Sequence, residues 1–128
     1  MSQDAREAFA TEFDVSRETL AKLDRYAELL TEWQQRMNLV GPSTLPHIWD
    51  RHFRDSAQLF AIAGPGKSWL DIGAGGGFPG LVLAILDPES NITLVESVTK
   101  KCRFLDTVAH ETDTAGHVAV ANVRVEAL

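Results

Sequence analysis

A glycine-rich segment at residues 69–80, with the sequence WLDIGAGGGFPG, constrains the fold of this chain more than any other feature. An apolar run ends in Asp71, a cluster of glycines follows, and an apolar stretch resumes at Leu81. This order is typical of a β-strand that passes through a tight loop into a helix whose first turn faces a ligand. Glycine lets a ligand approach the backbone, and the helix N-terminus offers free N–H groups. The segment therefore predicts a nucleotide-type cofactor site.

Length and composition are those of one globular domain. The 128 residues contain a polar N-terminus without the apolar segment of a secretory signal, and no apolar run approaches the roughly 20 residues that span a membrane. Cys102 is the only cysteine, so an internal disulfide is impossible and a reducing compartment fits. We therefore expect a cytoplasmic protein without a membrane partner. The net charge of −6 argues against bulk electrostatic binding of nucleic acid, although a local basic patch remains possible.

The N-terminal half has the pattern of helices. Ser16 is a candidate N-cap, and apolar residues then recur at three- and four-residue steps: Leu20, Leu23, Ala27, Leu30, Trp33 and Met37. The segment 41–44 interrupts this pattern, and a second helix is expected to begin near Pro46 and to end at residues 64–66. We therefore predict a helical N-terminal extension over residues 1–66.

From residue 67 onward, strands alternate with helices. The expected strands are 69–72, 91–96 and 117–123, and the expected helices are 81–86 and 98–111. This alternation predicts a parallel sheet with right-handed crossovers, in an α/β, Rossmann-like fold with helices on both faces of the sheet. Residues 67–128 would supply only the first half of that sheet, so the chain is expected to be truncated at its C-terminus relative to a complete fold.

The glycines fit two kinds of cofactor loop. Gly75, Gly77 and Gly80 match the G-x-G-x-x-G pattern of dinucleotide sites, which makes NAD a candidate. Gly73, Gly75 and Gly77 also form G-x-G-x-G, and Asp71 lies two residues before it. A carboxylate at this place would repel a pyrophosphate, whereas it suits a cationic ligand that carries an ammonium group. S-adenosylmethionine has an ammonium and a sulfonium and no phosphate.

A second acid follows the next strand. Glu96 is 19 residues after Gly77, where a carboxylate can accept both ribose hydroxyl protons of either cofactor. Together, Asp71, the glycines and Glu96 favour S-adenosylmethionine. The alternatives are that Asp71 only caps the following helix, and that Glu96 is a solvated charge at a strand end.

Longer motifs carry a resemblance to a known family. They are NLV at 38–40, RHFRDS at 51–56, LDIGxGxGFPG at 70–80, KKxRFL at 100–105 and RVE at 124–126. With these motifs in this order, the chain resembles the glucose-inhibited division protein B family, the small-subunit ribosomal RNA guanine-N7 methyltransferases. The resemblance implies a class I methyltransferase fold and methylation of N7 of a guanine in 16S ribosomal RNA with S-adenosyl-L-methionine. It implies the small ribosomal subunit as partner and a monomer at full length.

The resemblance also implies the residues of the donor site. Gly73, Phe78, Val125 and Glu126 would form it, with Phe78 beside the cofactor and the last two flanking the adenine, while Glu96 would hold the ribose. Asp71, Gly75 and Gly77 complete the predicted cofactor-binding set.

The expected chemistry needs few groups. Guanine N7 bears a lone pair and no proton, so its attack on a sulfonium methyl needs no general base, and we expect no catalytic residue. His52, Asp55 and Ser56 are interpreted as a packing and capping cluster. Lys100, Lys101 and Arg103 form a compact basic cluster, in which Lys100 and Arg103 are candidate contacts to RNA phosphates. No spacing of metal ligands occurs. An NAD-dependent oxidoreductase, or an inactive fragment that binds a cofactor or partner, remains the alternative.

Overall fold

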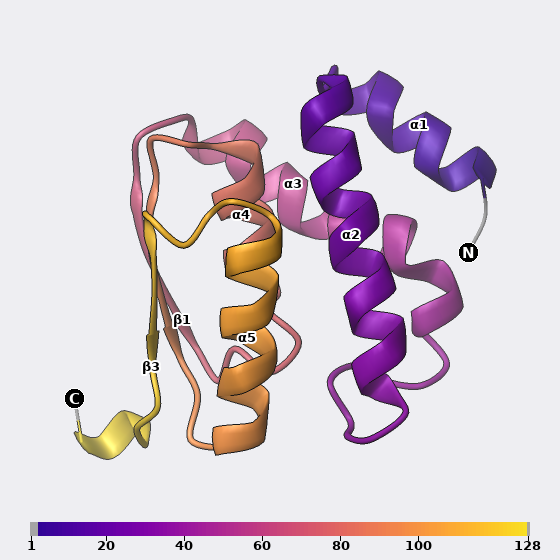
Figure 1. Cartoon of the computed structure of the whole chain (residues 1–128). Helices are drawn as coiled ribbons and strands as arrows, with labels where there is room; N and C mark the ends of the chain where they lie inside the picture. The colour runs from indigo at the N-terminus through magenta and orange to yellow at the C-terminus, as the bar shows by residue number, and fades with distance from the viewer. Residues whose placement is uncertain (1–2, 128) are drawn as a thin grey trace.

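The computed structural model describes residues 3–127, and it places the helices on one side of a three-stranded parallel sheet (Figure 1). The elements in chain order are α1 (Gln3–Phe13), α2 (Arg17–Gln34), the 3₁₀ turn η1 (Leu45–His47), the π-helical turn η2 (Trp49–Phe53), α3 (Arg54–Ala63), β1 (Ser68–Ile72), α4 (Gly80–Leu86), β2 (Asn91–Val95), α5 (Thr99–Glu111), β3 (Val118–Ala121) and the 3₁₀ turn η3 (Val125–Ala127).

Helix α2 begins where the sequence predicts. The Ser16 hydroxyl accepts a hydrogen bond from the Thr19 N–H at 3.1 Å, as an N-cap does. The predicted stripe reached Met37, but the helix ends at Gln34, after which the Arg36 N–H donates to the Trp33 carbonyl only three residues back, as in a 3₁₀ turn.

Two helical features differ from the sequence prediction. Helix α1 was not predicted, since its sequence is mostly polar, yet it buries Phe9 against Trp49 with ring centroids 5.4 Å apart. The single helix expected from Pro46 onward is divided into η1, η2 and α3. Within η2 both Trp49 and Phe53 are buried, and their rings meet edge to face at 4.8 Å. Burial of these aromatic rings stabilises the irregular turn.

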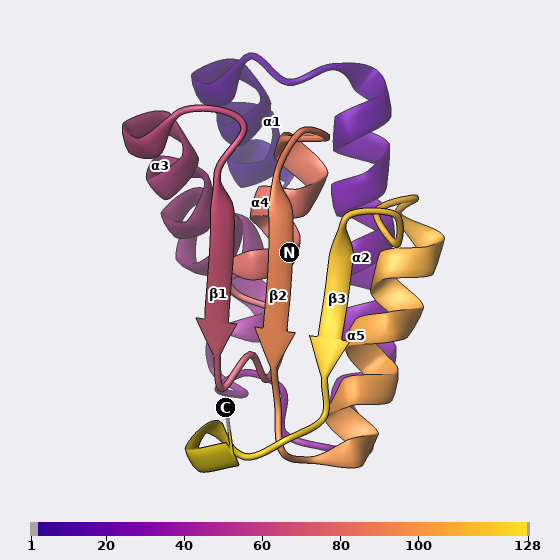
Figure 2. The ribbon, with the colours of Figure 1, turned by 90° about the vertical axis from the view of Figure 1, so that its left-hand side faces the viewer.

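The sheet has the order β1-β2-β3, and both pairs of strands are parallel. The strands agree with the prediction to within a residue, except that β3 is shorter than 117–123. Connections between parallel strands are right-handed, so two crossovers that advance in the same direction put both helices on one face. Figure 2 shows the strands in front of all the helices. Helices on both faces were expected; within residues 3–127 one face is uncovered, and Leu70 and Ile72 are more than half exposed there.

One hydrophobic core joins the helical segment to the sheet. Helix α4 is buried along nearly its whole length and contacts α2, α3, β1 and β2. The division of the chain at residue 66 therefore stays a prediction, because the same core holds both parts. Among the described residues, no helix is both long and apolar enough to cross a bilayer.

Candidate cofactor site

The loop that follows β1 is tied to the end of β2. The N–H groups of Gly73 and Ala74 donate to the Val95 carbonyl at 2.8 and 3.0 Å. The Glu96 carboxylate accepts the Gly75 N–H with one oxygen and the Val98 N–H with the other, each at 2.9 Å. The carboxylate thus joins the glycine loop to the start of α5, and it is only 6% exposed. Both bonds are charge-assisted, so they fix the loop more firmly than neutral ones would.

The helical segment supports the loop from behind. Tyr26 of α2 is fully buried, and its hydroxyl donates to the Gly76 carbonyl at 2.6 Å. At Gly77, where φ is +95°, an added Cβ would lie 2.6 Å from the Tyr26 hydroxyl oxygen and 2.5 Å from a Leu81 methyl carbon. Only glycine fits this backbone without displacing its neighbours.

A second support comes from the chain after α2. The Gln34 side-chain oxygen accepts the N–H groups of Leu39 and Val40 at 2.9 and 3.1 Å, and its nitrogen donates to the Val40 carbonyl. These hydrogen bonds hold the backbone of residues 39–40 close to the glycine loop. An added Cβ on Gly76 would lie only 2.9 Å from the Leu39 carbonyl oxygen. The glycine loop is therefore held on three sides.

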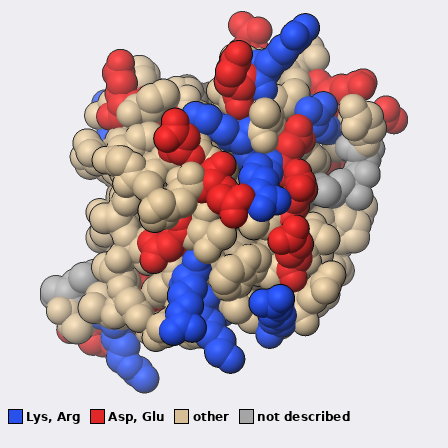
Figure 3. Space-filling model, viewed as in Figure 1, with Lys and Arg blue, Asp and Glu red and all other residues tan. Residues whose placement is uncertain are grey.

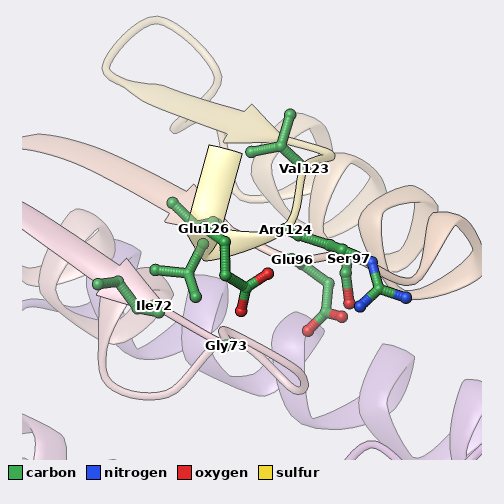
Figure 4. A pocket seen from close by; sticks show the side chains of 9 residues that line it. Ile72, Gly73, Glu96, Ser97, Val123, Arg124 and Glu126 are labelled. Carbon is green, nitrogen blue, oxygen red and sulfur yellow. The ribbon is translucent and has the colours of Figure 1, made fainter. Parts of the chain in front are cut away.

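A pocket opens on the remaining side, at the carboxyl ends of the strands. It encloses about 170 Å³ and is lined by Ile72, Gly73, Val95, Glu96, Ser97, Val123, Arg124, Val125 and Glu126. Figure 4 shows the carboxylates of Glu96 and Glu126 directed into the same cavity, whereas the Arg124 side chain extends to one side near Ser97. The apolar side chains of the wall are Ile72, Val95, Val123 and Val125.

Four of the predicted cofactor residues meet in this pocket: Gly73, Glu96, Val125 and Glu126. Gly73 has φ +70°, and a Cβ added to it would meet no atom within 4 Å, so its exposed backbone faces open space. Gly75 and Gly77 do not line the pocket; they shape the loop behind it, Gly75 through its bond to Glu96 and Gly77 beside Tyr26.

The structure places Asp71 and Phe78 outside this pocket. The Asp71 carboxylate accepts the Gly80 N–H at 3.0 Å, which is the capping alternative, and burial raises the pKa of this carboxyl although the bond to Gly80 partly offsets it. The Phe78 ring stacks on Tyr26 at 5.3 Å and on His52 at 4.7 Å, toward the helical segment. Phe78 does not line the pocket, and its place beside the cofactor stays a prediction.

His52 and the single cysteine have structural partners. The His52 Nε2 lies 2.8 Å from the Thr44 hydroxyl, and burial lowers the pKa of the imidazole. Cys102 is inward, as predicted, and its Sγ donates to the Glu96 carbonyl. Over residues 3–127, no three His, Cys, Asp or Glu side chains gather closely enough to hold a metal ion.

Basic side chains surround the carboxyl edge of the sheet. Figure 3 shows Lys and Arg gathering over the start of α5, the end of α2 and the segment after β3. These segments carry Lys100, Lys101, Arg103, Arg36 and Arg124, which we call the basic edge. The ion pairs found among the described residues use other arginines, namely Arg6, Arg25 and Arg54. The charges of the basic edge are therefore not neutralised by neighbouring carboxylates.

Sequence reasoning missed the two supports of the loop. Tyr26 fits the apolar stripe of α2, three residues after Leu23 and four before Leu30, so its burial could have been predicted. Nothing local indicates that its hydroxyl reaches a carbonyl 50 residues further along the chain. Gln34 gave no signal, because a glutamine near a helix end is usually solvated.

The residues of the pocket fit the nucleoside part of a cofactor. The open space above Gly73 admits a ligand against the backbone, Glu96 lies at the strand end where ribose hydroxyls bind in such folds, and Val123 and Val125 offer apolar contact to a base. Two carboxylates make the pocket unfavourable for a pyrophosphate and favourable for a cationic ligand.

The parallel sheet, the glycine loop and the pocket at its carboxyl edge define a Rossmann-like class I methyltransferase fold. Solved structures agree: the chain is similar to an O-methyltransferase from Bacillus cereus in complex with SAH, with a TM-score of 0.58 and 16% identity over 84% of this chain and 46% of that one. A putative O-methyltransferase from Klebsiella pneumoniae gives a TM-score of 0.54 at 16% identity, over 77% of this chain and 41% of that one.

The family follows from the sequence comparison. Residues 19–128 match the model of GidB, rRNA small subunit methyltransferase G, and the chain belongs to this family. Relatives named ribosomal RNA small subunit methyltransferase G include one from Bradyrhizobium diazoefficiens, 50% identical over 85% of this chain and 43% of the relative. Another, from Methylorubrum extorquens, is 47% identical over all of this chain and 61% of the relative. The chain spans about half the length of the curated relatives it matches.

Proposed function

We propose that this protein methylates N7 of a guanine in 16S ribosomal RNA, with S-adenosyl-L-methionine as methyl donor. The observation that carries the proposal is the pocket in which Gly73, Glu96 and Glu126 meet at the carboxyl edge of the sheet, in a chain of the GidB family. The substrate is the small ribosomal subunit or its RNA, which implies that the protein acts in the cytoplasm.

The pocket residues have distinct roles in this proposal. Glu96 accepts hydrogen bonds from the ribose hydroxyls with the lone pairs that its bonds to Gly75 and Val98 leave free. Val123 and Val125 contact the adenine, and the backbone of Gly73 permits close approach. Glu126, next to Val125 in the chain, flanks the adenine with it, and its negative charge adds to that of Glu96 in attracting the cationic donor.

The transfer itself asks little of the side chains. The donor supplies a sulfonium methyl, and guanine N7 displaces the sulfur with its lone pair, so no proton has to be removed. What the protein provides is alignment of the two reactants and exclusion of water. The rigid support of the glycine loop by Tyr26 and Gln34 serves this alignment.

The basic edge supplies the contact to RNA. Lys100 and Arg103 lie near the start of α5, which begins two residues after the pocket residue Ser97, and Arg124 lines the pocket itself, so this edge attracts phosphates although the net charge is −6. Binding through a few such contacts weakens steeply as salt rises, because counterions are released from the RNA.

Calorimetry tests the donor site. S-adenosylhomocysteine should bind this chain and NAD should not, and Glu126→Gln should weaken S-adenosylmethionine, which carries the extra sulfonium charge, more than S-adenosylhomocysteine. Asp106→Asn, an exposed acid on α5, is the matched control. Binding of NAD without binding of S-adenosylhomocysteine would favour the oxidoreductase alternative and contradict the proposal.

A transfer assay tests the activity. Small-subunit particles from cells that lack the modification are incubated with tritiated donor and either this chain or a full-length relative. Label at guanine N7 with both proteins supports the proposal. Binding of the donor without transfer, while the longer relative is active, would favour the alternative of a cofactor-binding fragment.

A further inference from the structure

A second cavity lies on the other side of the glycine loop, between α3 and the start of α4. It encloses about 280 Å³, and its walls include Arg51, His52, Asp55, Leu59, Phe78 and Pro79. The cofactor pocket begins at Gly73 and this cavity ends at Phe78 and Pro79, so the two occupy opposite ends of one loop. We call it the α3 cavity.

The inner wall of the α3 cavity is a stack of flat rings. Phe78 stacks on Tyr26 with 15° between the ring planes, and His52 stacks on Phe78 with 21° between them. The Thr44 hydroxyl, 2.8 Å from Nε2, fixes the imidazole in place. A rigid stack that reaches a cavity wall at His52 is suited to a further planar ring, and unpaired RNA bases bind on such platforms.

An apolar side chain faces the cavity from α3. Leu59 is 39% exposed although it is large and aliphatic, and no other described residue completes its burial. Pro79 provides a second apolar surface. A bound ring would remove these groups from water, which favours an aromatic ligand over a small ion.

The charged groups of the cavity are a guanidinium and a carboxylate four residues apart in the chain. Arg51 and Asp55 are both exposed, and residues four apart face the same side of a helix. Even so, no ion pair joins them, and neither pairs with any other residue among those described. The cavity therefore offers a free donor and a free acceptor beside a flat wall, and the carboxylate disfavours a phosphate.

We propose that the α3 cavity binds a guanine base of the RNA, with Asp55 accepting the N1–H and N2–H protons and Arg51 donating to O6. Among the four RNA bases, only guanine presents two adjacent donors next to a carbonyl oxygen. A base held through N1, N2 and O6 uses its Watson–Crick edge and keeps N7, on the neighbouring Hoogsteen edge, unbonded. The inference rests on the proposed function and names the site that would select its substrate base.

A nuclear magnetic resonance titration of this chain tests the proposal with four mononucleotides as probes. GMP should shift the Leu59 methyl and His52 ring signals and bind about fivefold to a hundredfold more tightly than AMP, the range expected for one bidentate base contact. IMP, which lacks the N2 amino group, should fall between them. The N7-methylated form of GMP should retain the guanine preference, because N7 is not used for recognition.

The decisive variant is Asp55→Asn. This variant should remove the preference for GMP over AMP, because the amide NH₂ of asparagine is a donor that would face an N–H donor of guanine. The affinity for S-adenosylhomocysteine should stay unchanged. Asp106→Asn makes the same chemical change on α5, away from the cavity, and should alter neither. Thermal unfolding of both variants checks that they are folded.

The outcomes separate this inference from the proposed function. Equal binding of GMP and AMP, or shifts confined to residues of the cofactor pocket, would overturn the guanine site while binding of S-adenosylhomocysteine still supported the methyl-donor site. An unchanged preference in Asp55→Asn would overturn it as well. A guanine preference at Leu59 in a chain that does not bind S-adenosylhomocysteine would support the cavity and contradict the donor site.

Discussion

Removal of the Tyr26 hydroxyl tests whether the helical segment positions the cofactor loop. In Tyr26→Phe, the ring remains and keeps its stack on Phe78, but the hydrogen bond of 2.6 Å to the Gly76 carbonyl is lost. Among the described residues, that carbonyl has no other hydrogen-bond partner. A buried group left unsatisfied costs about 1–3 kcal/mol.

Two measurements follow from this magnitude. The urea midpoint of Tyr26→Phe should fall by about 1 M, which is about 2 kcal/mol divided by a urea dependence of about 2 kcal/mol per molar. The affinity for S-adenosylhomocysteine should fall by about twofold to tenfold, because part of the lost energy, up to about 1.4 kcal/mol, is spent on ordering the loop when the ligand binds.

A second buried hydroxyl provides the control. Thr112 is fully buried and donates to the Val108 carbonyl at 2.7 Å, at the far end of α5. Thr112→Val should lower stability to a similar extent and leave ligand affinity unchanged. If Tyr26→Phe binds S-adenosylhomocysteine as tightly as the unmodified chain does, under conditions where both proteins are folded, then the Tyr26 hydroxyl does not position the glycine loop for the ligand.

Three further changes test other parts of the site. Gly73→Val should abolish binding of S-adenosylhomocysteine in calorimetry, because a branched side chain would enter the open space of the pocket and φ of +70° strains any residue with a Cβ by about 1–2 kcal/mol; unchanged affinity would place the ligand elsewhere. Glu96→Ala should weaken the same ligand by about 1–3 kcal/mol through lost charge-assisted hydrogen bonds, and a loss of less than a few tenths would exclude Glu96 from ribose binding. For His52, the folded state holds the pKa of the imidazole below its ordinary 6.5, so the unfolded state takes up the proton first and stability should fall as pH drops through 6.5. The free energy of unfolding in urea should fall less between pH 7.5 and pH 5 for His52→Gln than for the unmodified chain. Equal decreases in the two proteins would contradict the assignment of this pH dependence to His52.

The order of elements could be predicted because each depends on local sequence. Strand β2 is β-branched and bounded by polar residues, and Ser16 caps α2 through a neighbour three residues away. Helix α1 could not be predicted, since its one fully buried residue, Phe9, is covered by aromatic rings some 40 residues later in the chain. Where the burial of a helix depends on residues far away in the chain, its local composition does not predict that it packs against the core.

The site shows the same limit. The positions of Gly73 and Glu96 follow from the geometry of parallel strands, whose carboxyl ends meet at one edge, and the structure brings both into the pocket. For Asp71 the sequence left two roles open, and the choice depended on which side of β1 the side chain faces. Phe78 turns toward Tyr26 and His52, a preference set by rings in the helical segment that the loop sequence alone does not reveal.

The unpaired cations of the basic edge give the molecule an electric dipole. Negative charge dominates the rest of the protein, so a polyanion that approaches from most directions is repelled and one that approaches the carboxyl ends of the strands is attracted. In the function proposed above, this charge distribution would turn the protein, before any contact forms, so that the carboxyl edge of its sheet meets the RNA first. At about 0.15 M salt this steering acts only within about 8 Å of the surface, and it fades further as ionic strength rises.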